Sequence, residues 1–358
     1  MIGSYPAPYR VTVFKRLSDY YDLTVFFDTE KNENRSKEWF VRDKTFFSVL
    51  NKREPRKQFI KSLLRIRDYD FVIPYDALRK PSIAAILMCK LFRIPYFVNC
   101  DGAIIKRNAI KDAIKRFLFS GGAAFFSSGK AATEYFMTCG VPRNKIFEHH
   151  FTSLQEEDFL KTPLSQEQKS KIRNELGLQD KITFLTIGQF IPRKGIDILL
   201  KAWNIANIKD CQLVIIGGGD EKPLYMEMIE EMKADNIIVL DYMNKDEIFK
   251  YYDAADVFVL PTREDIWGLV VNEAMARALP VISTDNCVAA KELIDEGLGG
   301  YIVPVEDAEQ LANRMRILAE APERCAEMGC YNLKKESGFT VFRIADEHYR
   351  VIQKVLDY

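Results

Sequence analysis

Residues 257–273 read VFVLPTREDIWGLVVNE: four apolar residues, a polar loop and the start of a helical pattern. In parallel α/β sheets, ligands bind beyond the carboxyl ends of the strands, where backbone amides at helix starts receive anions. The loop carries Asp265 and the helix carries Glu273, so a helical rise would separate the two carboxylates by about 12 Å. The amides between them, which we expect to face bound phosphates, belong to Ile266, Trp267, Gly268 and Leu269.

Two further strand ends carry features that suit a phosphate ligand: one is followed by a pair of cations, and the other by glycines. The apolar run 183–187 is followed by a loop with adjacent cations, Arg193 and Lys194, just before a helical pattern over 196–206. A cation pair beside a helix start is what a departing diphosphate requires. Three glycines follow the run 212–216, and their missing side chains allow a ligand close to the backbone. Cations that bind a diphosphate, together with separated carboxylates that bind hydroxyls at the two ends of the ligand, suit a nucleotide sugar.

The rest of the chain alternates strand-like and helix-like patterns, which predicts α/β units with parallel sheets. A polar stretch, 151–180, is the natural connection between two such units, and 339–358 predicts a closing helix with no strand after it. Only two residues precede Gly3, so the first strand is either very short or missing. The expected strands are 23–27, 71–74, 96–99, 124–127, 183–187, 212–216, 237–240, 257–260 and 280–283, with helices over 82–92 and 131–139 among the connections.

Composition excludes several classes of protein. The chain has 358 residues, 47% hydrophobic and 28% charged, which fits two soluble domains rather than disorder or a collagen. No apolar run is long enough for a membrane-spanning helix, and the first residues do not form a signal peptide. The seven cysteines are scattered and contain no C-x-x-C, which predicts reduced thiols in the cytoplasm.

Charge is balanced overall but not along the chain. Residues 1–150 hold 27 basic and 15 acidic residues, whereas 151–358 hold 24 and 36. Two explanations are equally open: the basic half meets an anionic membrane surface, or two oppositely charged domains attract each other.

A basic amphipathic segment lies within 104–120. It could lie on a membrane, but packing of its apolar stripe on the core is the commoner arrangement. The stripe comprises Ile110, Ala113, Ile114, Phe117 and Leu118, and the cations beside it are Lys106, Arg107, Lys111, Lys115 and Arg116.

With these motifs in place, residues 183–305 resemble the nucleotide-sugar domain of family 4 glycosyltransferases. The matching pieces are IGQFIPRKGIDILLKAW, LVIIGGGDE, VLDYMNKDEIFKYYDAADVFVLPT, EDIWGLVVNEAMARALPVIST and KELIDEGLGGYIVPVED. Residues 125–154 (FFSSGKAATEYFMTCGVPRNKIFEHHFTSL) resemble the end of the acceptor domain in members that build bacterial surface polysaccharides. The resemblance implies the GT-B architecture: an α/β protein with two facing Rossmann-like domains. We expect an acceptor domain over 1–152, a donor domain over 153–338 and a closing helix over 339–358 that packs back toward the first domain.

The resemblance also implies roles for residues. Lys194 would bind the donor diphosphate with help from Arg193, Glu273 would bind the ribose, and Asp265 would hold the transferred sugar. Asp101, at a strand end of the first domain, would face the cleft and polarise that sugar. The remaining donor-side residues are Gly188, Gly218, Tyr242, Met243 and Glu264, the two at 242–243 meeting the base.

Three departures from the family pattern affect these roles. Asp265 is one methylene shorter than the usual glutamate, and the neighbouring Glu264 is a candidate substitute. Gln189 replaces an arginine, which moves phosphate binding toward Arg193. Residues 287–290 (CVAA) stand where many members have glycines.

The resemblance implies a retaining, metal-independent glycosyltransferase without a cofactor. Its donor would be a nucleotide-diphosphate sugar, and its acceptor a glycan or a polyprenyl-diphosphate-linked oligosaccharide in polysaccharide biosynthesis, with no nucleic acid involved. We expect a cytoplasmic location and leave open a peripheral one on the inner face of the cell membrane, through the basic first domain. Two alternatives stay open: a GT-B sugar-nucleotide epimerase, and a non-catalytic nucleotide-binding partner subunit.

Overall fold

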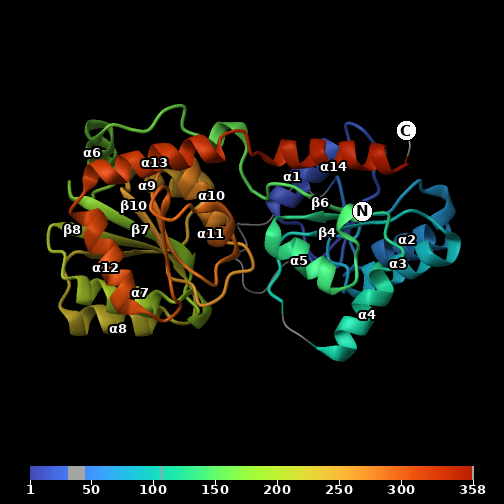
Figure 1. Ribbon diagram of the computed structural model, residues 1–358, viewed down its shortest axis with the longest axis horizontal. Helices are drawn as coiled ribbons and strands as arrows, with labels where there is room; N and C mark the ends of the chain where they lie inside the picture. Colours follow the sequence, from blue (N-terminus) through green and yellow to red (C-terminus); the bar gives the residue numbers. More distant parts are fainter. Residues whose placement is uncertain (31–44, 106–107, 357–358) are drawn as a thin grey trace. The chain divides into compact units, whose positions relative to one another are not determined.

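The computed structural model describes residues 1–30, 45–105 and 108–356, which form two compact α/β units (Figure 1). The first unit comprises Met1–Ser153 and Phe339–Tyr358, and the second comprises Leu154–Gly338. Two of the predicted basic residues, Lys106 and Arg107, and the last two residues of the predicted closing helix lie outside the described residues.

The second unit is built on a six-stranded parallel sheet in the order β12-β11-β10-β7-β8-β9. Its inner strands are buried and mostly apolar because helices cover both faces. Since β7 lies between β8 and β10, the chain adds strands first on one side and then on the other. The carboxyl ends of β7 and β10 therefore meet at the point where the strand order reverses, which is where open α/β sheets bind ligands. The strands are β7 (Ile182–Gln189), β8 (Cys211–Gly218), β9 (Ile237–Leu240), β10 (Val257–Leu260), β11 (Val281–Thr284) and β12 (Gly300–Val303).

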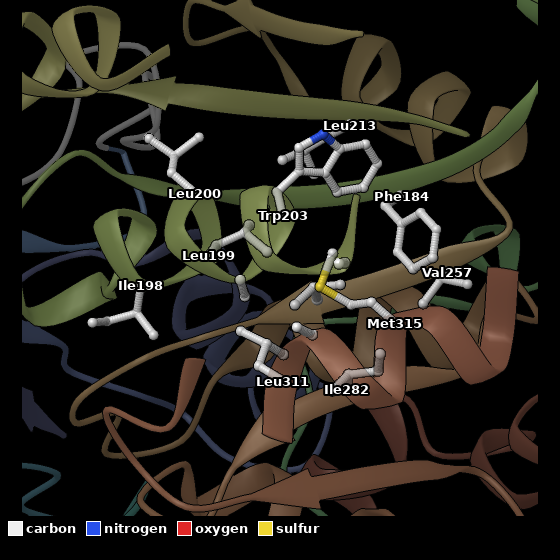
Figure 2. Close-up of a cluster of buried hydrophobic side chains, with 14 of the residues drawn as sticks. Phe184, Ile198, Leu199, Leu200, Trp203, Leu213, Val257, Ile282, Leu311 and Met315 are labelled. Carbon is white, nitrogen blue, oxygen red and sulfur yellow. The ribbon is translucent and has the colours of Figure 1, made fainter. Parts of the chain in front are cut away.

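A hydrophobic core of the second unit lies between this sheet and the helices α7 and α12. Figure 2 shows Trp203 and Leu199 of α7 and Met315 of α12 together with Phe184 and Val257 of the sheet, all buried. Figure 1 shows α7, α8 and α12 on one side of the sheet and α9, α10 and α13 on the other. The helices are η4 (Glu156–Asp158), α6 (Gln166–Glu175), η5 (Pro192–Lys194), α7 (Ile196–Ala206), α8 (Lys222–Met232), α9 (Lys245–Ala254), α10 (Leu269–Ala276), α11 (Val288–Leu293), α12 (Ala308–Ala319) and α13 (Pro322–Glu336).

The first unit has two three-stranded parallel groups, β1-β2-β3 and β4-β5-β6. Residues 72–75 join them: the Ile2 amide donates to Ile73 at 3.0 Å on one side, and the Phe97 amide donates to Val72 at 2.9 Å on the other. The two groups thus form one continuous parallel sheet. Its strands are β1 (Ile2–Gly3), β2 (Phe26–Phe27), β3 (Ser48–Val49), β4 (Phe97–Cys100), β5 (Ala124–Ser127) and β6 (Ile146–Glu148).

The last helix belongs to the first unit, although it follows the second in sequence. It packs against α1, and its His348 ring contacts Phe126 of β5 at a tilt of 43°, with ring centroids 3.9 Å apart. The helices of this unit are α1 (Pro8–Leu17), α2 (Arg53–Leu64), η2 (Ile66–Asp68), α3 (Lys80–Phe92), α4 (Ala109–Phe119), α5 (Lys130–Thr138), η3 (Arg143–Lys145) and α14 (Val341–Leu356).

The α/β class and the parallel sheets predicted from the sequence are confirmed. Every strand expected in the second half is present, and each bound lies within two residues of the expected one; β7 and β8 both run two residues further at their carboxyl ends. The first strand is present as the two-residue β1. The segment 71–74 was expected to be a strand, but it contributes only isolated bridges at Val72 and Pro74. The expectations omitted β3, β6 and β12, which are only two to four residues long.

The predicted connection, residues 151–180, includes the boundary between the two units at Ser153 and Leu154, but most of it belongs to the second unit and contains α6. Arg173 anchors this helix through Asp256 and the carbonyl of Ala254, so a buried ion pair rather than an apolar stripe holds it.

The expectation that the apolar stripe of α4 packs on the core is wrong for most of the stripe. Only Leu118 of the stripe is buried, together with the neighbouring Phe119, whereas Ile110, Ala113, Ile114 and Phe117 are exposed.

Within the described ranges, we find no helix that combines the length and the apolar composition needed to cross a bilayer.

Candidate functional site

The loops that follow β7 and β10 meet through one ion pair. Lys194 Nζ lies 2.5 Å from Asp265 Oδ2, and each side chain is only 14% exposed. Lys194 ends η5, directly after β7, and Asp265 lies in the loop after β10. The structure therefore brings together, at the switch point of the sheet, the cation and the carboxylate that the sequence singled out 71 residues apart.

The surroundings of Asp265 keep it ionised. Burial alone would raise the pKa of its carboxyl group, but the Lys194 ammonium, the Arg193 charge and the Trp267 amide together hold that pKa below its ordinary value. The amide donates to Asp265 Oδ1 at 3.3 Å. The carboxylate thus accepts from a side chain and from the backbone of its own loop.

A glycine lets the two loops touch. Gly195 has φ +66°, and a Cβ atom there would lie 2.1 Å from the carbonyl oxygen of Pro261. Only glycine fits such an approach. The backbone of Arg193 is held from the other loop as well, since its carbonyl accepts from the Arg263 amide at 2.8 Å and from Thr262 Oγ1 at 3.0 Å. Because these contacts fix the backbone on both sides, Lys194 is presented by a rigid turn.

The Arg193 side chain also ties the loops together. Its Nη1 donates to the carbonyl oxygen of Glu264 at 2.7 Å. A guanidinium group has five N–H donors, so this contact leaves donors for a ligand.

Arg263 is a positioning residue that the sequence analysis did not identify. Its guanidinium makes two hydrogen bonds to the Asp197 carboxylate, at 2.8 and 2.7 Å, donates to the carbonyl of Pro192 at 2.5 Å and pairs with Glu306. These partners raise the pKa of Arg263 above its ordinary value. The side chain connects the start of α7, η5 and the loop after β10. Its place in the quoted loop was visible in the sequence, but its distant partners were not.

The start of α10 requires a second glycine. Gly268 caps this helix with φ +104°, and a Cβ atom there would lie 2.9 Å from Cys287 Sγ. The neighbouring Trp267 is buried, and its Nε1 donates to Asn272 at 2.9 Å, which in turn donates to the buried Glu336 at 2.8 Å. This chain fixes the first turn of α10, whose leading amides have no acceptor within the helix.

Glu273 lies inside α10 and is half-buried. Tyr252 Oη of α9 donates to Glu273 Oε2 at 2.9 Å. Burial, together with the nearby Glu273 carboxylate, raises the pKa of Tyr252 well above its ordinary value, so this hydroxyl stays a donor. A fully buried neighbour therefore orients the Glu273 carboxylate.

The other expected donor-side residues lie at neighbouring strand ends. Gly188 of β7 is paired with Gly217 of β8, and Gly218 is paired with Gln189. A Cβ atom on Gly218 would come within 3.3 Å of the Tyr242 ring, so this ring covers the end of β8. Met243 and Leu269 are half-buried, and Ile266 is exposed.

The residues that depart from the family pattern pack into the same loops. Gln189 is buried at the end of β7. Cys287 Sγ lies 3.2 Å from the Trp267 carbonyl oxygen, which also accepts from the Ala289 amide at 2.8 Å. Glu264 is half-buried, next to Asp265.

Asp101 lies in the first unit, after β4. Its carboxylate pairs with the buried Arg10 at 2.7 Å and accepts from Tyr9 Oη at 3.2 Å and from Asn99 Nδ2 at 2.5 Å. Arg10 also pairs with Asp76 at 3.1 Å. This cluster occupies the carboxyl edge of the first sheet. Asp101 thus belongs to the first unit, whereas Lys194 and Asp265 belong to the second.

Several known proteins are similar to this chain. Residues 168–335 match the family model described as glycosyl transferases group 1. An uncharacterised 41.2 kDa protein in the cps region of Klebsiella pneumoniae is 24% identical over 323 residues, covering 85% of this chain and 87% of that protein. Spore coat protein SA of Bacillus subtilis is 31% identical over 201 residues, which is 53% of each chain.

A solved structure matches over nearly the full length. The Anabaena protein Alr3699/HepE in complex with UDP has a TM-score of 0.79 and 15% identity, covering 99% of both chains. The chain has the GT-B fold. Together, the match of residues 168–335 and these similarities support a GT-B glycosyltransferase.

Proposed function

We propose that the protein is a retaining glycosyltransferase that moves a sugar from a nucleotide-diphosphate sugar to a glycan or lipid-linked oligosaccharide. The observation that carries this proposal is the Lys194–Asp265 pair at the switch point of the second sheet. A cation and a carboxylate side by side suit the two ends of the scissile bond, where the phosphate gains negative charge and the sugar ring gains positive charge.

The described residues divide the work as follows in this proposal. Lys194 and the remaining Arg193 donors neutralise the diphosphate, with the leading amides of α10 beside them. Glu273, oriented by Tyr252, accepts from the ribose hydroxyls. Asp265 holds the transferred sugar, and the Tyr242 ring at the end of β8 lies beside the base. In the structure Lys194 is paired with Asp265, so the incoming diphosphate would share this lysine with the carboxylate.

Transfer then follows from charge. The bond between the sugar C1 and the diphosphate oxygen breaks, and the electron pair leaves with the phosphate. The acceptor oxygen attacks C1 from the same face, which retains the anomeric configuration, and the leaving phosphate takes the acceptor's proton. Donors held in place before the reaction stabilise this separated charge by several kcal/mol, about 3 kcal/mol for a single donor in well-studied cases. Cationic side chains take the place of a metal ion in this scheme.

For the acceptor, we propose a polyprenyl-diphosphate-linked oligosaccharide in the biosynthesis of a cell-surface polysaccharide. The resemblance noted from the sequence and the Klebsiella relative in a cps region support this context. The 27 basic residues among the first 150 suit an acceptor that carries phosphates, and they suit a cytoplasmic enzyme at the inner face of a membrane.

The test measures binding and transfer separately. A panel of nucleotide sugars is screened by thermal shift, since a ligand of the folded state raises the melting temperature. With the best donor, Lys194→Ala and Glu273→Gln are each expected to weaken binding more than tenfold and to abolish transfer. Lys201→Ala, which changes an exposed lysine on α7, is the matched control and retains both. Full transfer by both site variants would refute the proposal.

The same preparation tests the two alternatives. Donor incubated alone would yield an isomerised sugar nucleotide if the protein were an epimerase. Donor binding without any transfer, unchanged in Lys194→Ala, would indicate a non-catalytic subunit. NMR analysis of the product's anomeric configuration tests retention, and activity after exhaustive chelation tests metal independence.

A further inference from the structure

The first unit carries a surface whose apolar side chains have no covering element within the described residues. Helix α4 presents Ile110, Ile114 and Phe117 to solvent, with 75%, 47% and 57% of their surfaces exposed. Their spacing of four and three residues puts them on one face of the helix. Leu118 and Phe119, near the C-terminal end of α4, are the only buried residues of this helix. They anchor the helix, and the three apolar side chains before them are left uncovered.

The two neighbouring helices continue this feature. Helix α3 packs against both α2 and α4. It exposes Leu87 and Leu91, and α2 exposes Ile60 and Leu64, each pair again four residues apart. Figure 1 shows α2, α3 and α4 grouped in the first unit. We call these seven residues the apolar surface: Ile60, Leu64, Leu87, Leu91, Ile110, Ile114 and Phe117. Single exposed apolar residues are ordinary, but three adjoining helices that each expose a spaced set indicate an interaction site.

The charged residues around the apolar surface indicate which kind of partner it binds. Helices α2, α3 and α4 contain nine lysines and arginines but only two acidic residues. One of the two, Asp112, lies within 3.5 Å of Lys115 Nζ, and the other, Glu54, is 2.8 Å from Lys57 Nζ. Lys90 Nζ lies 5.0 Å from the centre of the Phe117 ring, so cations sit directly among the apolar side chains. Apolar side chains surrounded by cations complement a bilayer that has anionic headgroups above an apolar interior.

We propose that the apolar surface of α2, α3 and α4 docks the first unit onto an anionic lipid bilayer. This extends the proposed function, because a lipid-linked acceptor is presented at such a surface. Docking is nonetheless independent of chemistry at Lys194, so the two proposals fail separately. In the docked state, the apolar stripe of α4 enters the boundary between headgroups and acyl chains, while Lys111 and Arg116 contact lipid phosphates.

The test is co-sedimentation of the full chain with phosphatidylcholine vesicles, with and without phosphatidylglycerol. We expect binding to the phosphatidylglycerol vesicles alone, and its release when salt is raised from about 0.1 M to about 1 M, which shortens the Debye length from about 10 to about 3 Å. Ile110→Ser/Ile114→Ser/Phe117→Ser is expected to lower the partition coefficient at least tenfold. Lys111→Glu/Arg116→Glu should do the same, because each cation near an anionic membrane contributes roughly a factor of five.

Matched controls come from the second unit. Leu224→Ser/Met226→Ser removes exposed apolar residues of α8, and Lys209→Glu/Lys250→Glu reverses exposed cations; neither should change vesicle binding. The thermal shift with donor is measured for every variant and should match that of the wild type. If the wild-type protein does not bind anionic vesicles at low salt, or if the α4 variants bind them as tightly as the wild type does, the proposal is overturned. A concentration-dependent dimer that the triple variant abolishes would also overturn it, by assigning the surface to a second copy.

Discussion

A buried tyrosine sets the direction of one candidate site carboxylate. Tyr252 is fully buried and donates to Glu273 at 2.9 Å, whereas Glu273 itself is half-buried. Hydrogen bonds to charged groups contribute about 1.5–3 kcal/mol, so the orientation of this carboxylate depends strongly on one hydroxyl.

We therefore predict that Tyr252→Phe weakens donor binding by about tenfold while the fold is retained, because phenylalanine fills the same space. The matched control is Tyr251→Phe, a half-buried tyrosine one position earlier, which should bind donor like the wild type. Calorimetric titration with donor measures both. Equal affinities for the two variants would show that Glu273 does not depend on Tyr252.

Gly268 is the residue on which the helix start depends. Its φ of +104° and the 2.9 Å approach of Cys287 Sγ both act against any side chain. We predict that Gly268→Ala lowers the free energy of unfolding by about 1–3 kcal/mol and reduces donor binding.

The double variant Gly268→Ala/Cys287→Ala separates the two causes. It removes the contact with sulfur but leaves the strained backbone, so we expect only partial recovery of the melting temperature. Full recovery would mean that the backbone conformation costs nothing at this position.

At the scale of elements, the candidate site lies where η5, the loop after β10 and the start of α7 contact one another. Arg263 contacts all three, through Pro192, its own loop and Asp197. Its bidentate contact with Asp197 depends on the planar shape of guanidinium, which lysine does not share.

We predict that Arg263→Lys keeps the fold but raises the donor concentration needed for half-maximal transfer by tenfold or more, because η5 no longer presents Lys194 in place. Arg314→Lys, at an arginine of α12 that pairs with Glu296 at 3.6 Å, is the control. Transfer kinetics over a range of donor concentrations test this. An unchanged donor dependence in Arg263→Lys would exclude a positioning role.

The sequence predicted the helices and strands better than the side-chain contacts between them. The apolar runs of the second sheet gave β9 and β10 at their observed bounds, because both are short and wholly apolar, although β9 is a half-buried edge strand. It missed the anchoring of α6, since Arg173 and Asp256 are 83 residues apart and only the fold reveals their contact. For the same reason it found Lys194 and Asp265 but not Arg263, whose contacts are all made after folding. The α4 stripe was misjudged because periodicity identifies an apolar face but does not reveal what covers it.

At the scale of the whole molecule, two histidines far apart in sequence meet inside the first unit. His149 follows β6 and His348 lies on α14; their ring centroids are 5.0 Å apart, and both are buried. Among the described residues, His149 has no hydrogen-bond partner on either ring nitrogen, and His348 bonds only to Tyr75 Oη, at 3.2 Å. Burial lowers the pKa of His149 to about 3, and burial also lowers the pKa of His348 well below its ordinary value.

Both imidazoles are therefore neutral in the folded chain but protonated in the unfolded chain below about pH 6.5. The unfolded state then binds more protons, so stability falls as the pH is lowered from 6.5, by about 2 kcal/mol per histidine at pH 5. We predict that the melting temperature declines over this range, and that His149→Phe/His348→Phe flattens the decline. His150→Phe is the control. An undiminished slope in the double variant would contradict the assignment.

We expect a nucleoside diphosphate to bind at the switch point of the second sheet. A crystal structure with bound UDP or GDP tests it most directly. We predict diphosphate oxygens within hydrogen-bonding distance of Lys194 Nζ and ribose hydroxyls at Glu273. A nucleotide bound with its diphosphate remote from 193–194 and 265–273 would contradict the account.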